Sequence, residues 1–406
     1  MSSHISIINL PEEVLNLVYK YIPEMKDKLN LAKSHCVLGK AFALHVGGIF
    51  KEIEIAERPL GEWSDILALC GSSVTRIMTT AVNTTVTVVN LASKHCPNLE
   101  EFFFPVRSSS WNQIKSLLLT LRNLTWIGLM NNFEKANVVD TLLKMPKLKN
   151  LQLVGFNRQD WESVGKLVNL TELTIMNKKE ESADIFKVCS PLKNIDSLEF
   201  KSAFIRVPKN HGELWPKIDM LRFNYGIFKT PLRYLPSLKY LTIDSIAPRM
   251  NLTHVFGKSA SNYGKTLESL RFCTEIRRII DTDDLGVIMK LKALKKLDCQ
   301  VGGDDFMDYL SQLENLEKLI LQNSGLSNRG AMTLISRCKK LRDLDLFGCP
   351  RIYSDLVMEA VLALSTLRPP SEKPFILRVS RSFGPVDMSL LGGVLEIRYH
   401  NLFDFF

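Results

Sequence analysis

Two stretches of this sequence carry residues whose types and spacing could bind a phosphate or a metal ion. The first, Ser259–Thr266, reads S-A-S-N-Y-G-K-T and ends like a phosphate-binding loop. It begins with Ser259 where that loop requires glycine, and a strand is expected after it where the loop must open a helix. We therefore do not expect nucleotide binding at this stretch.

The second stretch begins at Asp281 with acidic residues spaced like the start of a calcium loop. Its fifth position is Leu285 and its twelfth is Lys292, where calcium requires an oxygen ligand and a bidentate glutamate. Acidic residues at the start of a helix explain this stretch better, because they complement the helix dipole. We expect a helix here and no calcium.

No catalytic or metal-binding pattern stands out elsewhere in the sequence. The seven histidines are scattered, and they form neither H-E-x-x-H nor a Cys/His metal spacing. No G-x-S-x-G elbow occurs, and no pattern places a nucleophile beside a base. We therefore expect a non-catalytic chain that uses no cofactor.

The chain is organised around a repeated apolar pattern, which is clearest in two copies beginning at Leu316 and Leu341. The copies read L-E-K-L-I-L-Q-N-S and L-R-D-L-D-L-F-G-C and begin 25 residues apart. Leucine-rich repeats have this L-x-x-L-x-L-x-x-N/C pattern and a period of about 20–29 residues. The alternation predicts a short strand with its apolar side chains facing inward. Asn323 or Cys349 is then expected to close the following turn from within.

The same pattern recurs along most of the chain at intervals of 20–29 residues. A helix is expected between successive strands, as in the run Ala331, Leu334, Ile335 and Cys338, whose spacing is helical. The windows begin at Phe50, Val74, Leu99, Leu124, Leu148, Leu170, Ile195, Ile218, Leu238, Leu267, Leu294, Leu316 and Leu341.

This spacing predicts an α/β fold, a right-handed leucine-rich repeat solenoid over residues 49–368. Parallel strands stack about 4.8 Å apart and helices about 8–10 Å apart, so the stack must curve into a horseshoe with the sheet on its concave face. Residues 369–406 are expected to hold irregular last repeats, with strands at Phe375–Val379 and Leu395–Ile397. The apolar C-terminal tail, Asn401–Phe406, is expected to pack as a cap or along the sheet.

Composition agrees with a folded repeat protein. The chain has 406 residues, 46% hydrophobic and 23% charged, with a net charge of +9. Eight cysteines occur without a C-x-x-C pair, and Cys96, Cys338 and Cys349 stand at repeat positions that call for small buried residues. Free buried thiols indicate a reducing compartment. With no signal peptide and no apolar run of membrane-spanning length, we expect a cytoplasmic or nuclear protein and no membrane partner.

The first 48 residues differ from the repeats and predict a unit of three short helices. Leu10-Pro11 followed by two glutamates predicts the start of the first helix, and Pro23 predicts its end. The second and third helices are expected over Lys26–Cys36 and Val37–Val46. A unit this small gains stability by packing on the first repeat, on a partner, or on both.

This segment resembles an F-box, on the runs L-P-E-E-V-L-N-L-V-Y-K-Y-I and L-N-L-A-K-S-H-C-V-L-G-K-A-F. It departs from that family in a slightly stretched link around Met25–Lys28 and in lacking the usual tryptophan near the motif's end, where Phe50 is the nearest aromatic. An F-box ahead of leucine-rich repeats is typical of substrate receptors of SCF-type cullin-RING ubiquitin ligases. The resemblance implies docking on the Skp adaptor, and through it on the cullin and RING core. The implied adaptor contacts are Leu10, Pro11, Val14, Leu15, Val18 and Leu29.

The outward positions of the repeat strands are rich in the aromatic, methionine and arginine side chains that binding hot spots use. We predict that a target protein binds the concave face. Trp126 is the sharpest candidate, because a tryptophan at an outward position has no core to enter, unless neighbours or the tail cover it. The predicted substrate contacts are Phe103, Trp126, Met130, Met176, Arg222, Tyr240, Arg271, Arg342 and Phe347.

Two alternatives remain open at the level of sequence. The N-terminal helices could serve as a cap for the solenoid, with or without adaptor binding. The whole chain could be a non-catalytic repeat scaffold that binds protein or nucleic acid without a ubiquitin role. We do not expect nucleic acid, because the net charge is mild and the densest basic cluster is typical of solvated surface.

Overall fold

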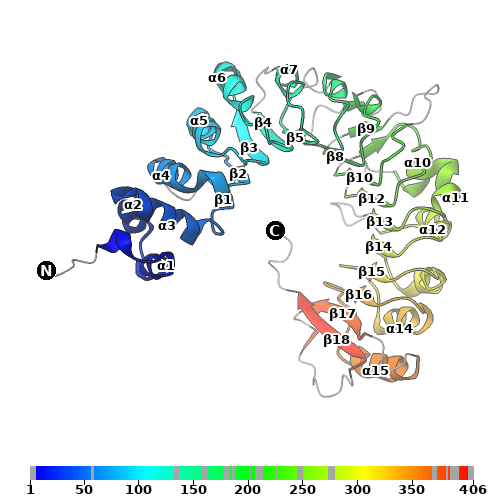
Figure 1. Ribbon diagram of the computed structural model, residues 1–406. Helices are drawn as coiled ribbons and strands as arrows, with labels where there is room; N and C mark the ends of the chain where they lie inside the picture. Colours follow the sequence, from blue (N-terminus) through cyan, green and yellow to red (C-terminus); the bar gives the residue numbers. More distant parts are fainter. Residues whose placement is uncertain are drawn as a thin grey trace. The chain divides into compact units, whose positions relative to one another are not determined.

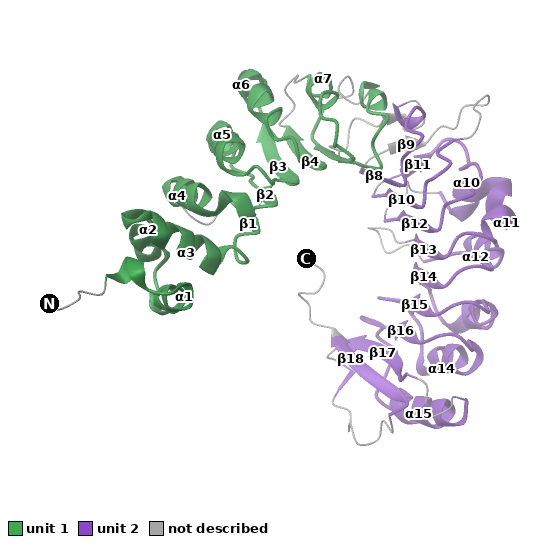
Figure 2. Ribbon diagram, viewed as in Figure 1, with its two compact units in different colours: residues 1–181 green, residues 182–406 purple. Residues whose placement is uncertain are grey.

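The structure is a computed structural model that describes residues 6–55, 59–131, 137–156, 162–176, 183–184, 188–201, 203–205, 214–224, 226–244, 250–272, 279–367, 373–380, 383–384 and 393–400 (Figure 1). Contacts divide the chain into two compact units, residues 1–181 and 182–406 (Figure 2). The units reflect packing, whereas the predicted domains 1–48, 49–368 and 369–406 reflect sequence character and stay a prediction.

The first unit opens with the three predicted helices, α1 (Glu12–Tyr21), α2 (Met25–Ser34) and α3 (Cys36–Val46), preceded by the short 3-10 helix η1 (Ile7–Asn9). Tyr19 lies at their centre and is fully buried. Its hydroxyl donates to the Leu38 carbonyl oxygen at 2.9 Å, and its ring meets Phe42 edge-on at 5.5 Å. These contacts hold α1 against α3. Burial raises the pKa of Tyr19 to about 12, so the hydroxyl stays a donor at neutral pH.

The sheet of the first unit is parallel, and its strands follow chain order. In Figure 1 helices α4, α5 and α6 cover one side of this sheet. The strands are β1 (Glu52–Glu54), β2 (Arg76–Met78), β3 (Glu101–Val106), β4 (Trp126–Asn131), β5 (Asn150–Val154) and β6 (Glu172–Met176). The connections hold η2 (Gly71–Ser73), η3 (Val82–Thr84), η4 (Val164–Lys166), α4 (Leu60–Cys70), α5 (Thr85–His95), α6 (Ser108–Leu118) and α7 (Val139–Leu142).

The second unit continues the repeat pattern with a parallel sheet in the order β8-β10-β12-β13-β14-β15-β16-β17-β18. These strands are β8 (Ser197–Lys201), β10 (Met220–Phe223), β12 (Tyr240–Ile243), β13 (Ser269–Phe272), β14 (Lys296–Cys299), β15 (Lys318–Ile320), β16 (Asp343–Asp345), β17 (Phe375–Ser380) and β18 (Leu395–His400). The connections hold α10 (Leu252–Phe256), η5 (Gly257–Ser259), α11 (Ala260–Tyr263), α12 (Thr282–Ile288), η6 (Asp304–Phe306), α13 (Met307–Leu310), α14 (Asn328–Arg337) and α15 (Leu356–Leu367).

Every predicted window forms a strand, and each strand begins two residues after the window's first apolar residue. The register explains this regularity, because apolar residues pair with their equivalents in the next repeat, as Leu319 does with Leu344. Leu316, Leu319 and Leu321 are fully buried. The two late strands also form, as β17 and β18. The chain is therefore an α/β leucine-rich repeat solenoid.

The turn after β15 differs from the prediction. Asn323 is exposed in a left-handed conformation with φ of 54°, whereas Ser324 is 1% exposed and its hydroxyl accepts from the Val301 amide at 2.9 Å. The ninth position of the L-x-x-L-x-L-x-x-N pattern, counted from Leu316, is Ser324. Asn323 therefore does not close the turn from within. Cys349 does so in the next repeat, where its thiol donates to the Leu321 carbonyl oxygen at 3.0 Å.

A second, small parallel sheet in the order β11-β9-β7 was not predicted. Its strands are β7 (Ala183–Asp184), β9 (Ala203–Ile205) and β11 (Gly226–Phe228). Trp215 adopts φ of 45° and is 1% exposed, and its indole N–H donates to the Cys189 carbonyl oxygen at 2.8 Å. This tryptophan fills the core of a repeat whose sequence is irregular.

The two stretches that imitate ligand sites have structural roles. Asp281 caps α12, and its side chain accepts from the Asp284 amide at 2.8 Å while the Asp284 carboxylate accepts from the Asp281 amide. Asp284 is fully buried and also accepts from the Leu252 amide at 2.7 Å, which ties α12 to α10. The stretch Ser259–Thr266 spans the end of η5 and α11, and β13 follows it. The tail, Asn401–Phe406, lies outside the described residues.

Candidate functional site

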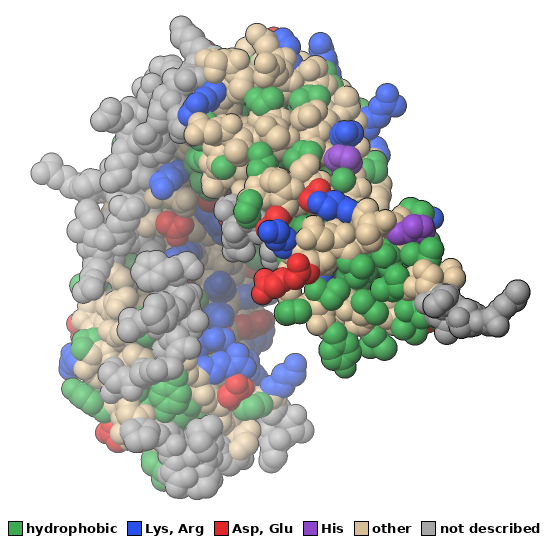
Figure 3. Space-filling model, turned by 90° about the vertical axis from the view of Figure 1, so that its left-hand side faces the viewer, with side chains coloured by type: hydrophobic (Ala, Val, Ile, Leu, Met, Phe, Trp, Pro, Cys, Tyr) green, Lys and Arg blue, Asp and Glu red, His purple; other side chains and the backbone are tan. Residues whose placement is uncertain are grey.

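The first helix carries an apolar stripe that faces away from the core. Val14, Leu17 and Tyr21 are 38%, 51% and 80% exposed, and their spacing puts them on one face of α1. Pro11 is also exposed, whereas Leu10 and Val18 are half-buried. Figure 3 shows hydrophobic side chains gathered over the N-terminal helices. Exposed apolar side chains grouped in this way mark a surface that excludes water when a partner covers it.

Two predicted adaptor contacts lie elsewhere. Leu15 and Leu29 are each 2% exposed and belong to the core of the three helices. They hold the unit together and offer no contact surface, which corrects their assignment. Leu17 and Tyr21 were missed, although their spacing from Val14 could have shown them.

The helical unit packs on the first repeat, as expected for so small a unit. Lys33 on α2 forms an ion pair with Asp65 on α4 at 2.7 Å. The His35 ring accepts from the Val37 amide at 3.2 Å and so caps the start of α3. One side of the unit therefore packs on α4, while the α1 stripe stays exposed.

The open side of the sheet in the first unit holds an aromatic pair. Phe103 on β3 and Trp126 on β4 stack with ring centroids 6.4 Å apart and ring planes at 28°. Gly128 lies opposite Phe103 in the register, and a Cβ there would come within 2.3 Å of the Phe103 ring and 2.7 Å of the indole. Glycine at this position therefore leaves the space that the two stacked rings occupy.

The outward exposure of these side chains is partial. Phe103 is 9% exposed, so the structure corrects the view that it projects freely, whereas Trp126 is half-buried. Met130 and Met176 are also half-buried, and they lie in the row Pro105–Met130–Val154–Met176 across neighbouring strands. The structure thus brings four predicted substrate contacts onto one face of the first unit.

The open sheet face of the second unit is charged. Arg222 pairs with Glu199 at 3.4 Å, and Arg271 pairs with Asp244 at 2.8 Å. Tyr240 lies on the same face and is 38% exposed. Arg222 and Arg271 are therefore engaged with carboxylates of neighbouring repeats.

Two further predicted contacts of the second unit, Arg342 and Phe347, lie just outside strand β16. Arg342 stands before β16 and not on its outward row, and its guanidinium donates to the carbonyl oxygens of Lys339 and Leu341 at 3.0 and 3.2 Å. Phe347 lies just past β16 with outward parity and is half-buried. Asp345, at the end of β16, is 3% exposed and accepts from the side-chain amide of Gln322 at 2.9 Å.

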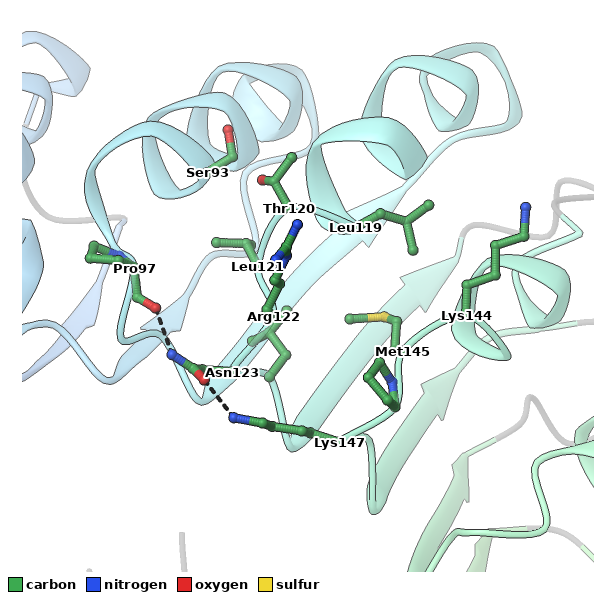
Figure 4. A pocket seen from close by; sticks show the side chains of 12 residues that line it. Ser93, Pro97, Leu119, Thr120, Leu121, Arg122, Asn123, Lys144, Met145 and Lys147 are labelled. Carbon is green, nitrogen blue, oxygen red and sulfur yellow. Dashed lines mark hydrogen bonds between the residues drawn. The ribbon is translucent and has the colours of Figure 1, made fainter.

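A pocket of about 710 Å³ lies at the turns that precede β4 and β5 (Figure 4). Asn123 spans it, donating to the Pro97 carbonyl oxygen and accepting from the Lys147 ammonium, each at 2.8 Å. Equivalent links recur one repeat apart, as where Asn98 donates to the Ser72 carbonyl oxygen at 2.8 Å. The hydrogen bonds of Asn123 in this pocket therefore link neighbouring repeats.

Within the described ranges, no group of three or more His, Cys, Asp and Glu side chains is arranged to hold a metal ion. The described helices include none that is long and apolar enough to span a membrane.

Comparisons with known proteins give fold similarity only. No protein-family model and no curated protein matches the sequence. An internalin (InlF) from Listeria monocytogenes is 15% identical with a TM-score of 0.43, over 86% of this chain and 94% of that one. A leucine-rich repeat protein from Leptospira interrogans is 13% identical with a TM-score of 0.41, over 84% and 98%. A chain of the Rad7 and Elc1 complex from yeast is 14% identical with a TM-score of 0.45, over 95% of this chain and 92% of that one.

Proposed function

We propose that this chain is the non-catalytic substrate-recognition subunit of an SCF-type cullin-RING ubiquitin ligase. The observation that carries the proposal is the exposed apolar stripe of α1, Val14, Leu17 and Tyr21, on the helical segment that resembles an F-box and directly precedes the repeats. In this role the three helices dock on the Skp adaptor, and the repeats bind the target protein.

The physical case for docking rests on the cost of leaving this stripe in water. Covering a leucine or similar side chain contributes about 1.5–3 kcal/mol. Tyr21 is 80% exposed and Leu17 is 51% exposed, so a partner could still bury most of the tyrosine and half of the leucine. A partner helix or groove that covers the stripe would therefore gain the apolar anchors on which interfaces depend.

The repeats supply the second half of the function by proximity. A receptor that holds a target near a ubiquitin-charged enzyme raises the effective concentration of the target's lysines. The chain itself needs no nucleophile, base or cofactor for that task. Its predicted substrate contacts lie on the open sheet faces, apart from Arg342, which bonds to the turn before β16.

The test is co-purification of the full-length chain with the Skp adaptor. We expect a stoichiometric complex with the wild type and loss of that complex in Leu17→Asp with Tyr21→Asp, with an unchanged melting temperature because both side chains are exposed. Leu362→Asp on α15 is the matched control, because that leucine is 67% exposed on another helix. Deleting residues 1–48 is less informative, since the deletion also uncovers α4.

Two outcomes contradict the proposal. One is that the wild type fails to capture the adaptor. The other is that the double variant captures it as well as Leu362→Asp does. Either result leaves a repeat protein whose N-terminal helices serve only as a cap.

A further inference from the structure

The open sheet face of the first unit is acidic around its aromatic pair. On the outward rows of β1, β2 and β3 stand Glu52, Glu54 and Glu101, and Arg76 is the one cation among them. Arg76 pairs with Glu52 at 3.5 Å and with Glu101 at 3.3 Å. Three carboxylates thus face one guanidinium, in a chain whose net charge is +9.

These carboxylates keep access to solvent. The side chains of Glu52 and Glu101 are 65% and 42% exposed, so their pairing with Arg76 is weak. Glu101 lies opposite Trp126 in the register of β3 and β4. An exposed carboxylate is therefore adjacent to the indole on the same face. Lys51 and Lys149 precede β1 and β5 by one residue, so they do not belong to the outward rows that contain these glutamates.

The second unit provides a contrast in chemistry. Several of its outward charges are paired within the fold, since Lys318 and Arg378 both pair with Asp343, at 2.8 and 2.9 Å, and Arg271 pairs with Asp244 at 2.8 Å. A face whose charges are compensated within the fold gains little from an added cation. The face of the first unit retains negative charge beside an aromatic surface.

We propose that the Phe103–Trp126 face binds a basic protein segment, with a lysine or arginine placed over the indole and beside Glu101. This deepens the proposed function, on which it rests, by naming the chemistry of the substrate. Cations are attracted to the face of tryptophan, and the neighbouring carboxylates add to that attraction. Phosphates of a nucleic acid would instead meet Glu52, Glu54 and Glu101 and be repelled.

The neighbouring row adds a second requirement. Met130, Val154 and Met176 are half-buried and lie across β4, β5 and β6, one outward position beyond the row that contains Gly128. Such side chains accept an apolar residue and adapt to its shape. The segment that fits combines a cation with an apolar residue a short distance along the chain.

The experiment uses the full-length chain and an array of labelled peptides, each with one lysine or arginine near an apolar residue. Each peptide has a twin in which acetyl-lysine or citrulline replaces the cation. We expect a set of basic peptides to bind while their neutral twins do not. For these peptides, Trp126→Ala should weaken binding about five- to thirty-fold, and Trp126→Phe should weaken it less.

Two further variants locate the site. Glu101→Gln should weaken binding and flatten its dependence on salt, because it removes one charge from the face. Tyr309→Ala, an exposed aromatic on α13 of the second unit and outside the sheet face, should leave binding unchanged. The melting temperatures of all variants are compared, so that loss of binding is read only from folded protein.

Three results overturn the inference. They are equal binding of basic peptides and neutral twins, unchanged binding by Trp126→Ala, and binding of an RNA oligonucleotide that depends on Trp126. Adaptor capture is measured in parallel with the same variants. Failure of capture with intact peptide binding would refute the proposed ligase role alone, whereas intact capture with no preference for basic peptides would refute this inference alone.

Discussion

Arg378 on β17 holds Asp343 on β16 through two parallel hydrogen bonds, from Nε to Oδ1 and from Nη2 to Oδ2, each 2.9 Å long. Lys318 on β15 donates to the same carboxylate at 2.8 Å. The Asp343 side chain is 13% exposed and that of Arg378 is 20% exposed. One carboxylate therefore links the outward faces of three consecutive strands of the second unit.

Replacing Arg378 by alanine should destabilise the second unit by about 1–3 kcal/mol, because Asp343 loses two hydrogen bonds where water reaches it poorly. Arg378→Lys should fall between, since lysine keeps the charge but cannot form the two-pronged contact. The measurement is urea unfolding. Arg337→Ala is the control, because the pair it forms with Asp308 is more than 60% exposed on both sides and should matter by less than about 0.5 kcal/mol. Equal losses for Arg378→Ala and Arg337→Ala would contradict the prediction.

Stability should fall in acid partly through Asp343. Burial alone would raise the pKa of this carboxyl, but hydrogen bonds from Arg378 and Lys318 outweigh it and hold the pKa below its ordinary value. A lowered folded-state pKa means that the stabilisation is complete above the unfolded value of about 3.9 and is lost as the pH falls through the folded value. Urea unfolding of wild type and Asp343→Asn between about pH 6 and pH 3 should show a smaller decline in the variant. Identical declines would exclude this role for Asp343.

Two glycines of the second unit should respond to alanine with opposite signs. Gly286 lies exposed in α12 with open space around its Cα, so Gly286→Ala should stabilise by about 0.5–1 kcal/mol. At Gly264 a Cβ would come within 2.2 Å of the Lys290 carbonyl oxygen, so Gly264→Ala should destabilise by about 1–3 kcal/mol. Thermal and urea unfolding of both variants test the pair, and a shift of the same sign in both would be evidence against the packing described.

Two buried tryptophans form another matched pair. The indole N–H of Trp215 donates to the Cys189 carbonyl oxygen at 2.8 Å, whereas that of Trp63 has no hydrogen-bond partner in the described part of the chain. Trp215→Phe should therefore cost about 1 kcal/mol more than Trp63→Phe, because both lose similar volume but only one loses a hydrogen bond. Urea unfolding followed by fluorescence measures both, and a larger loss at Trp63 would refute the comparison.

The strands could be predicted because each repeat must bury three apolar side chains at fixed spacing. Leu316, Leu319 and Leu321 have no alternative to the core, so their pattern determines the strand. The strands of the small sheet were missed, because segments as short as Ala183–Asp184 contain no alternation to detect. The turn after β15 was assigned to Asn323 because of its residue type, although counting the repeat pattern from Leu316 puts the ninth position at Ser324.

The candidate site was predicted less well than the fold. Helix α1 is apolar on two faces, one with Leu15 and Tyr19 and the other with Leu17 and Tyr21. Sequence pattern alone does not say which face the neighbouring helices cover. Arg342 was taken as an outward position of its repeat strand, but it precedes β16, and because side chains alternate along a strand its position is not in the outward row of Asp343. Pairing of charges between repeats also required the register of the strands.

The uniform register of the strands has a consequence for how recognition can change over time. Backbone hydrogen bonds and inward leucines carry the scaffold, while each outward position belongs to one row and one repeat. Exchanging Gln152 or Thr174, for example, alters one outward side chain and leaves the core side chains next to it in the strand unchanged. Binding specificity can therefore change by one outward residue at a time. Duplication of a repeat would add a whole strand of outward residues and leave the existing ones in place.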